Sequence, residues 1–186
     1  MADSFTIIGL AGRMKSGKTM VADWLVEEHG FTKVSFGEGV RQEVARGWGV
    51  GVDTWKEMEK DNKNELRPIL QAWGMARRKV SGDNYWVLRA LEGLSLDVEN
   101  IVVDDVRFLN EVEAIKEFGG QTGWLEVNEA TQIERGANEE YLNHESEMEL
   151  SDAVWYPSFV VNTSSTTESS VLDFVELYLR LGGFLG

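Results

Sequence analysis

The chain has 186 residues, of which 42% are hydrophobic and 27% are charged, and it carries a formal net charge of -14. These values are typical of one globular domain, and they exclude a disordered chain. Because the chain has no cysteine, disulfide bonds, thiolate metal sites and a cysteine nucleophile are also excluded.

The distribution of charged and apolar residues limits the partners. Bases and acids nearly balance over residues 1–93, whereas acids far outnumber bases over residues 94–186. This acidity argues against binding a nucleic-acid polymer, although a small anion needs only a few bases in one place. No apolar run approaches the roughly 20 residues that span a membrane, and the N-terminus has an acid where a signal peptide needs bases. We therefore expect a cytoplasmic protein that binds no membrane, with residues 1–186 as a single domain.

Five short runs of β-branched or aromatic residues predict β-strands, at residues 5–10, 33–36, 100–104, 122–127 and 158–162. A helical period follows the first, third and fifth runs, at residues 21–28, 109–118 and 172–179. Strands that alternate with helices are typical of right-handed crossovers and a parallel sheet. The sequence thus predicts an α/β fold of three layers, with helices on both faces of a five-stranded parallel sheet.

Two longer stretches depart from this alternation. The residues between the second and third strands are mostly helical, at 54–61, 66–80 and 84–94, and Pro68 is tolerated only near a helix start. Residues 128–143 are polar, acidic and irregular. Ligands of such folds bind beyond the carboxyl ends of the strands, where excursions of this kind can close over them.

The first predicted strand runs into GRMKSGKT, a complete GxxxxGK[ST] phosphate loop at residues 12–19. Gly12 and Gly17 allow the backbone to curl so that successive N–H groups point into one anion-sized hollow. The following helix adds its positive N-terminal end. In this pattern Lys18 would bridge the β- and γ-phosphates of a nucleotide, and the hydroxyl of Thr19 would hold Mg²⁺.

An acid near the magnesium and arginines near the moving phosphoryl group complete such a site. Asp104 and Asp105 end the third predicted strand. Either could serve the metal or cap the next helix, and we select Asp105. Arg107 follows this pair and Arg135 lies in the irregular stretch, so both are candidates to stabilise the transition state, unless they are solvated or paired with an acid.

The helical stretch interleaves bases with aromatic and amide side chains, namely Arg67, Arg77, Arg78, Lys79 and Arg89 with Gln71, Trp73, Tyr85 and Trp86. Guanidinium groups suit phosphate and aromatic rings suit a nucleobase, but aromatics at helical spacing also form ordinary cores. Both interpretations stay open.

Two other classes of P-loop protein fit less well. Residues 62–65 nearly match the NKxD guanine motif of GTPases, but they precede the third strand, and no DxxG pattern follows the acidic pair. With 186 residues, the chain is short for a motor or packaging ATPase.

Six segments, in their order and spacing, carry a resemblance that covers nearly the whole chain: GRMKSGKTMVADWL (12–25), SFGEGVR (35–41), RPILQAWGMARRKVSGDNYWV (67–87), VVDDVRFLNEVEAIKEFGG (102–120), HESE (144–147) and VVN (160–162). They resemble the bacteriophage-type deoxynucleoside monophosphate kinases, within the wider nucleoside monophosphate kinase fold. The resemblance implies a P-loop kinase with a helical monophosphate-binding region at 37–95 and a small lid at 128–144. It also implies transfer of the ATP γ-phosphate to a deoxynucleoside monophosphate for deoxynucleotide biosynthesis, in the host cytoplasm if the chain is phage-encoded.

The resemblance assigns roles to individual residues. ATP would contact the loop and its flank, at Gly12, Arg13, Met14, Lys15, Ser16, Gly17, Lys18, Thr19 and Met20. The acceptor nucleotide would contact Arg41, Arg67, Gln71 and Arg78, with Trp86 lining or supporting its pocket and Glu111 beside it. Mg²⁺ would lie at Thr19 and Asp105, and Lys18, Asp105, Arg107 and Arg135 would act in the transfer itself.

Two alternative functions stay open. The chain could be another small-molecule P-loop kinase, such as a dephospho-coenzyme A kinase-like enzyme, or a non-kinase P-loop ATPase. A homodimer is compatible with the sequence. The accepted base depends on pocket shape and a few hydrogen bonds, which the sequence does not determine.

Overall fold

The computed structural model describes residues 6–92, 94, 98–139, 142 and 144–185. The chain divides into two compact units. We call Met1–Val34 with Leu96–Gly186 the sheet unit, and Ser35–Ser95 the helical unit. Among the described residues, no helix combines the length and the hydropathy needed to cross a bilayer.

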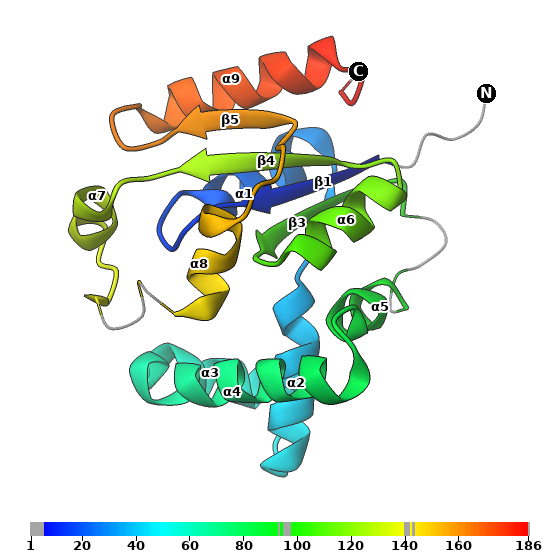
Figure 1. Cartoon of the computed structure of the whole chain (residues 1–186), viewed down its shortest axis with the longest axis vertical. Helices are drawn as coiled ribbons and strands as arrows, with labels where there is room; N and C mark the ends of the chain where they lie inside the picture. The colour runs from blue at the N-terminus through cyan, green and yellow to red at the C-terminus, as the bar shows by residue number, and fades with distance from the viewer. Residues whose placement is uncertain (1–5, 93, 95–97, 140–141, 143, 186) are drawn as a thin grey trace. The chain divides into compact units, whose positions relative to one another are not determined.

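The sheet unit is built on five parallel strands, ordered β2-β3-β1-β4-β5 across the sheet (Figure 1). They are β1 (Thr6–Ala11), β2 (Thr32–Val34), β3 (Asn100–Val106), β4 (Gln121–Glu126) and β5 (Phe159–Asn162). β1 lies at the centre of the sheet, and all six of its residues are buried, which explains its continuous apolar sequence. The predicted α/β fold with a five-stranded parallel sheet is confirmed.

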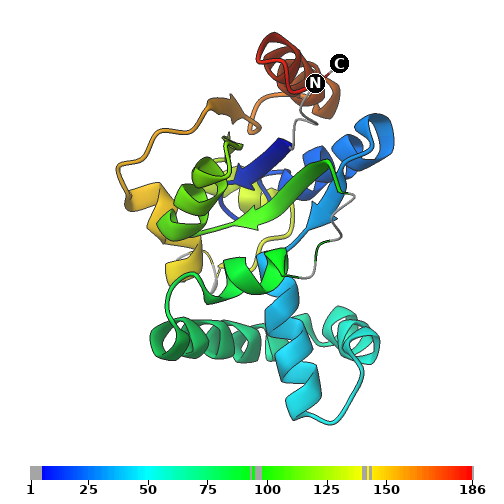
Figure 2. The ribbon, with the colours of Figure 1, turned by 90° about the vertical axis from the view of Figure 1, so that its right-hand side faces the viewer.

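Helices cover both faces of this sheet. The side chains of α1 (Lys18–His29) and α9 (Glu168–Leu181) share one core with Ile8 and Leu10 of β1. α6 (Leu109–Glu117) packs on the other face, where Ile115 lies against Gly9. Figure 2 shows α1 and α6 on opposite sides of the strands, which confirms the three layers.

Two predictions for the sheet unit were wrong in detail. The second strand ends at Val34 instead of continuing to residue 36, because Ser35 caps a helix whose first residue, Phe36, is buried. The stretch expected to be irregular contains α7 (Glu129–Glu134), which begins where the Asn128 side chain accepts a hydrogen bond from the backbone N–H of Thr131 at 2.8 Å. α8 (Glu145–Asp152) follows. Residues 140, 141 and 143 of the proposed lid lie outside the described residues, as does residue 5 of the first predicted strand.

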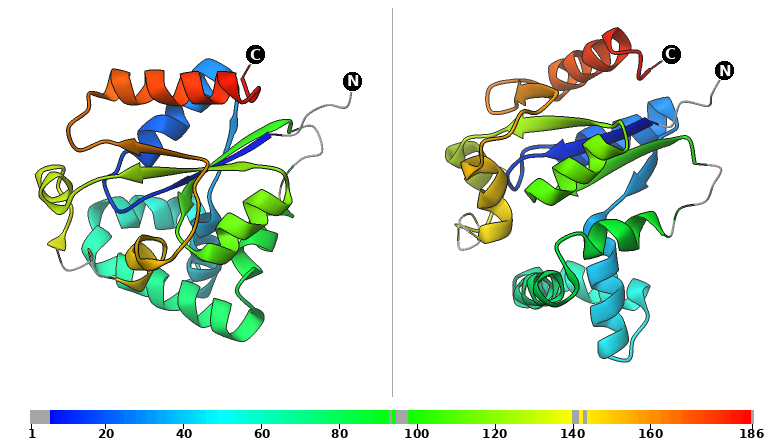
Figure 3. Two further views of the ribbon diagram at one scale, coloured as in Figure 1. Left: turned by 45° about the horizontal axis from the view of Figure 1, so that its top comes forward. Right: turned by 45° about the vertical axis from the view of Figure 1, so that its right-hand side comes forward.

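The helical unit consists of α2 (Phe36–Gly47), α3 (Val52–Asp61), α4 (Lys63–Ser81) and α5 (Tyr85–Leu91) (Figure 3). The three helices predicted here are confirmed as α3, α4 and α5, although residue 93 of the last lies outside the described residues. α2 was not predicted as a helix, because its glycines weaken a helical pattern. One of them has a packing role: a Cβ on Gly39 would lie 3.0 Å from the Trp86 ring.

Pro68 does not stand near a helix start. α4 begins at Lys63 and continues through the proline, which is its sixth residue. Because proline has no N–H, the helix lacks the bond that residue 68, in its second turn, would donate to the carbonyl of Asn64. The expectation about its position was therefore wrong, and the helix tolerates the loss.

Candidate active site

The phosphate loop connects β1 to α1, and its backbone has the curled form that the motif predicts. Gly12 and Gly17 have φ angles of 144° and 94°, and Lys15, with a φ of 63°, is the one non-glycine with positive φ among the described residues. A Cβ on Gly12 would collide with the carbonyl oxygen of Leu125 and with Ser16 Oγ. Glycine is therefore required at residue 12 by both conformation and space.

The side chain of Lys18 folds along the inside of this loop. Its Nζ donates hydrogen bonds to the carbonyl oxygens of Gly12 at 2.5 Å and Arg13 at 2.9 Å. Burial, followed by the charge of Arg107, lowers the pKa of Lys18 to about 8, although nearby carboxylates oppose the shift. An anion bound in the loop would favour the charged ammonium again.

A carboxylate beside the start of α1 belongs to Asp104. Its Oδ2 accepts a hydrogen bond from Thr19 Oγ1 at 3.2 Å and lies 2.9 Å from Lys33 Nζ. The structure thus brings Asp104 to the threonine, which is the other member of the pair from the selected Asp105. Asp104 stands two residues after Val102, whose side chain shares a core with α1, so the alternation of the strand directs Asp104 to the face that α1 covers. Beyond Val103 the pairing is irregular, because β1 advances from Gly9 to Ala11 while β3 advances by one residue more.

Thr19 and Asp104 offer a hydroxyl and a carboxylate oxygen, which are ligands that Mg²⁺ accepts. No group of three or more His, Asp or Glu side chains able to hold a metal occurs among the described residues. A magnesium ion that keeps several waters and shares a nucleotide's phosphate oxygens fits such a sparse protein site. The residues present are therefore compatible with Mg²⁺ bound together with a phosphate ligand.

Arg107 extends from the end of β3 and binds the carboxylate of Glu147 on α8 through Nη1. Burial opposes its charge, but the charge and hydrogen bond of Glu147 outweigh this and raise the pKa of Arg107. Glu147 Oε2 also accepts a hydrogen bond from the backbone N–H of Met14, at 2.7 Å. Glu147 was assigned no role from the sequence, although it belongs to the HESE segment, which is one of the six segments that carry the family resemblance.

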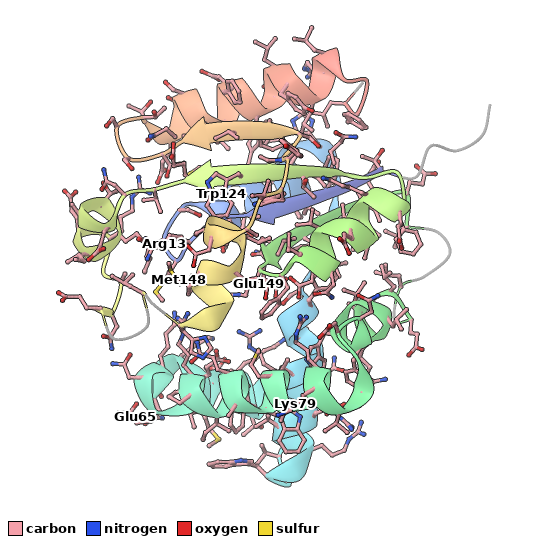
Figure 4. The ribbon with its side chains drawn as sticks, viewed as in Figure 1. Arg13, Glu65, Lys79, Trp124, Met148 and Glu149 are labelled. Carbon is pink, nitrogen blue, oxygen red and sulfur yellow. The ribbon has the colours of Figure 1, made fainter. Side chains whose placement is uncertain are left out.

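Residues after β4 bind the outer side of the loop. Arg135 donates to the carbonyl oxygens of Lys15 at 3.0 Å and Thr163 at 2.6 Å. The buried Gln132 donates to the carbonyl oxygen of Met14 at 2.7 Å. Arg13 donates to the carbonyl oxygen of Leu142 at 3.0 Å, and Figure 4 labels Arg13 on the loop. The structure therefore places Arg135 and Gln132 against backbone carbonyl oxygens of the loop, and the role of Arg135 in the transfer stays a prediction.

Two predicted site residues face elsewhere. Glu111 is buried, and its carboxylate accepts hydrogen bonds from the backbone N–H groups of Arg107 at 2.7 Å and Phe108 at 3.1 Å. It fixes the turn between β3 and α6 and does not present a surface to an acceptor. Met20 packs partly buried against the core beneath α1.

The residues predicted to bind the acceptor lie in the helical unit. Arg67, Gln71 and Arg78 share one side of α4 by their spacing. Arg78 is buried and donates to the carbonyl oxygen of Asp83 at 3.1 Å, while Arg41 on α2 binds Glu59 at 2.8 Å. The amide nitrogen of Gln71 is buried without a hydrogen-bond partner. Trp86 is buried and donates to the carbonyl oxygen of Gly74 at 3.0 Å, so it supports the unit from within.

A second group in the helical unit was not anticipated. Glu43 accepts hydrogen bonds from Arg77 and Trp73, both at 2.9 Å, and from the hydroxyl of Tyr85. Burial opposes the charge of this carboxylate, but its three donors outweigh burial and lower the pKa of Glu43. No local sequence pattern connects residues so far apart. We call these four side chains the Glu43 cluster.

No protein-family model matches the chain, and no curated protein matches its sequence. Solved structures do match it. A protein provisionally described as a kinase from Chloroflexus aurantiacus matches with a TM-score of 0.53 at 13% identity, over 98% of this chain and 100% of that one. TT1252 from Thermus thermophilus matches with a TM-score of 0.52 at 14% identity, over 96% and 98%. Shikimate kinase from Aquifex aeolicus matches with a TM-score of 0.49 at 17% identity, over 97% and 99%.

These identities establish a likeness of fold alone. In this chain the phosphate loop stands between the central strand and the first helix. The chain shares an α/β fold with these solved structures.

Proposed function

We propose that the chain transfers the γ-phosphoryl group of ATP to a deoxynucleoside monophosphate, giving ADP and the deoxynucleoside diphosphate. The observation that carries the proposal is the set of groups gathered at the phosphate loop. Lys18 and Thr19 begin α1, Asp104 stands on β3, and Arg107 follows β3 directly. Thr19 donates a hydrogen bond to Asp104, and the charges of Asp104 and Arg107 act on Lys18. This is the set that phosphoryl transfer requires, because the protein's task there is positioning and charge neutralisation.

The loop holds the phosphates of ATP. Its backbone N–H groups and the N-terminus of α1 receive the phosphate oxygens, and the ammonium of Lys18 neutralises their charge. Mg²⁺ at Thr19 and Asp104, when bound, supplies further positive charge to the phosphate oxygens. The guanidinium of Arg107 carries the positive charge that the moving phosphoryl group needs. Arg135 holds the loop at Lys15 from the proposed lid.

The proposal that the acceptor is a nucleotide rests on the family resemblance and on the chemistry of the helical unit. Arg41, Arg67 and Arg78 supply guanidinium groups suited to a phosphate, and Gln71 supplies an amide suited to a base edge. The buried amide nitrogen of Gln71 lacks a partner, which is a costly arrangement that a ligand could relieve. Arg41 and Arg78 would exchange contacts with Glu59 and Asp83 for an acceptor phosphate.

A coupled assay of ADP release tests this function. The purified chain is incubated with Mg²⁺ and ATP, alone and with each of the four common deoxynucleoside monophosphates. We expect at least one monophosphate to stimulate ADP release and to yield its diphosphate. Steady ATP hydrolysis that no monophosphate stimulates would contradict the proposal, and stimulation only by an acceptor that is not a nucleotide would identify a different small-molecule kinase.

A further inference from the structure

Glu147 is a buried carboxylate at the edge of the phosphate loop. Its side chain is 1% exposed, although it stands in the first turn of α8, which begins at Glu145. One carboxylate oxygen accepts the N–H of Met14 in the loop, and the other binds Nη1 of Arg107. Glu147 thus joins three separate parts of the sheet unit: α8, the loop and the end of β3.

The burial of this charge is informative because an ionised carboxylate is costly to remove from water unless it is paired and hydrogen-bonded. Two groups of the candidate site, the N–H of Met14 and the guanidinium of Arg107, contribute to this compensation. Arg107 is in turn held at both ends, since Glu111 accepts its backbone N–H at 2.7 Å while Glu147 binds its guanidinium. A guanidinium has five N–H donors, so it can bind a carboxylate and a phosphate oxygen together.

We propose that Glu147 is a positioning residue that holds the guanidinium of Arg107 beside the phosphate loop. The proposal rests on the proposed function, in which Arg107 stabilises the charge of the transferred phosphoryl group. Glu147 itself touches no substrate in this scheme. Its contribution is to keep Arg107 and the loop residue Met14 in one fixed arrangement, so that no reorganisation is needed when the charge develops.

The same contacts are also compatible with a different role for Glu147, which predicts the opposite effects on ATP binding and on the rate of transfer. A carboxylate on a loop N–H and an arginine could be a substitute for phosphate that ATP must displace. Removing its charge would then tighten ATP binding. If Glu147 positions Arg107, removing the charge slows transfer and leaves the affinity for ATP nearly unchanged.

The variant Glu147→Gln tests the proposal, with Glu149→Gln as its matched control. Glu149 stands on the same helix and its carboxylate also accepts a backbone N–H, that of Leu109 at 3.0 Å; Figure 4 labels it on α8. We expect Glu147→Gln to lower kcat about 10²-fold, because misplacing a catalytic group by about 1 Å has such an effect. The KM for ATP should change less than about threefold, and Glu149→Gln should keep kcat within about threefold of the parent chain.

A double-mutant cycle with Arg107→Lys separates positioning from general stability. If Glu147 acts through Arg107, the double variant should be about as slow as Arg107→Lys alone, because the two changes remove the same interaction. Multiplicative effects would overturn the proposal, as would a Glu147→Gln variant that binds ATP more tightly. Should Glu147→Gln fail to fold, Glu147→Asp keeps the carboxylate and should retain more of kcat than Glu147→Ala at equal thermal stability.

Failure of this inference and failure of the proposed function give different results. If no monophosphate is phosphorylated by the parent chain, the function is wrong, and the cycle is measured on ATP hydrolysis. The same non-additivity is then expected, because the contact between Glu147 and Arg107 does not depend on the acceptor. If a monophosphate is phosphorylated but the effects multiply, only the role of Glu147 is wrong.

Discussion

The two units of the chain arrange their charges in different ways. In the sheet unit, side chains from several elements converge on one loop: Lys18 lies within it, and Arg107, Arg135 and Glu147 reach it from later in the chain. In the helical unit, three arginines form separate pairs with acids, at Arg41–Glu59, Arg77–Glu43 and Arg78–Asp83. The cores differ as well, since aliphatic side chains predominate beside Phe31 and Phe159 in the first, and Trp55 and Trp86 are the largest buried side chains of the second.

The two charge arrangements suit different kinds of ligand recognition. A converging arrangement binds one kind of ligand, an anion, and its geometry is set by the backbone of the loop. The arginines of these three pairs are compensated in the free chain, so a ligand that binds them must compete with an existing partner or share the guanidinium with it. We therefore expect substitutions in the sheet unit to affect the chemical step, and substitutions in the helical unit to affect stability and acceptor selection.

The largest expected effect tests whether the units are independent. Trp55 is fully buried in the helical unit, so Trp55→Ala should lower the free energy of unfolding of that unit by about 3–5 kcal/mol. Trp48, its edge-to-face partner with ring centroids 5.2 Å apart, is 52% exposed, so Trp48→Ala should cost much less. Urea unfolding followed by circular dichroism measures both. ATP affinity should stay within about threefold in each variant; a parallel collapse of ATP binding would show that the units fold as one.

The next effect concerns the chemistry of the sheet unit. Lys18→Ala removes the ammonium inside the loop, and we expect kcat to fall about 10²–10³-fold. Lys116→Ala is the control, because Lys116 is an exposed lysine of the same unit that binds only the carbonyl oxygen of Tyr156 in the contacts described. Initial rates at saturating ATP measure both. A loss of less than about tenfold for Lys18→Ala would refute the role given to this side chain.

A smaller effect is expected from the Glu43 cluster. Glu43→Gln leaves three donors without a charged acceptor and should destabilise the chain by about 1–3 kcal/mol. Glu38→Gln, on the same helix, breaks only a partly exposed pair with Lys56 and should cost less than about 1 kcal/mol. Thermal unfolding at pH 7 compares the two variants.

The loss of stability in Glu43→Gln should depend on pH. Because the pKa of Glu43 in the folded chain lies below its ordinary value of 4.5, its stabilisation is complete above that pH and is lost as the pH falls through the folded value. The difference in Tm between the parent chain and Glu43→Gln should therefore shrink on acidification below about pH 4.5. A difference that is constant down to pH 3 would argue against the charged cluster.

The smallest expected effect is the uptake of a fraction of a proton when ATP binds. With a pKa of about 8 for Lys18, the ammonium is partly deprotonated in the free chain at alkaline pH, and bound phosphates should restore the proton. Calorimetry in two buffers of different ionisation enthalpy should show uptake of about half a proton on ATP binding at pH 8, and much less at pH 7. The same pKa predicts that the buried ammonium lowers the free energy of unfolding by its full amount below about pH 8. This destabilisation fades as the pH rises toward 10.5, because the folded chain then loses the proton more readily than the unfolded chain. Uptake that is equal at both pH values would contradict the low pKa.

Much of the fold could be predicted because it is encoded locally. The central strand is apolar apart from Thr6, and the helices repeat their apolar residues with a helical period. The phosphate loop is local too, since all its residues are consecutive. α2 was missed because Gly39 has a purpose only against Trp86, which lies on another helix.

The remaining parts of the site depend on contacts between distant residues. Glu147 is separated from Met14 by 133 positions, and no periodicity relates them. The contact between Thr19 and Asp104 joins residues 85 positions apart, so it depends on the pairing of β3 with β1, which is not a property of either strand alone. The family resemblance placed Glu111 beside the acceptor, whereas in the structure its carboxylate accepts backbone N–H groups just before α6.

The placement of the two acids has a consequence for engineering. Asp104 reaches Thr19 and Lys33 from the face of β3 that α1 covers, while the charge of Asp105 contributes to the raised pKa of Arg107. A phosphate loop grafted from this chain onto another sheet would therefore lack its acidic partner unless β3 were moved with it. The transferable unit is a pair of strands, of which only one carries the recognisable motif.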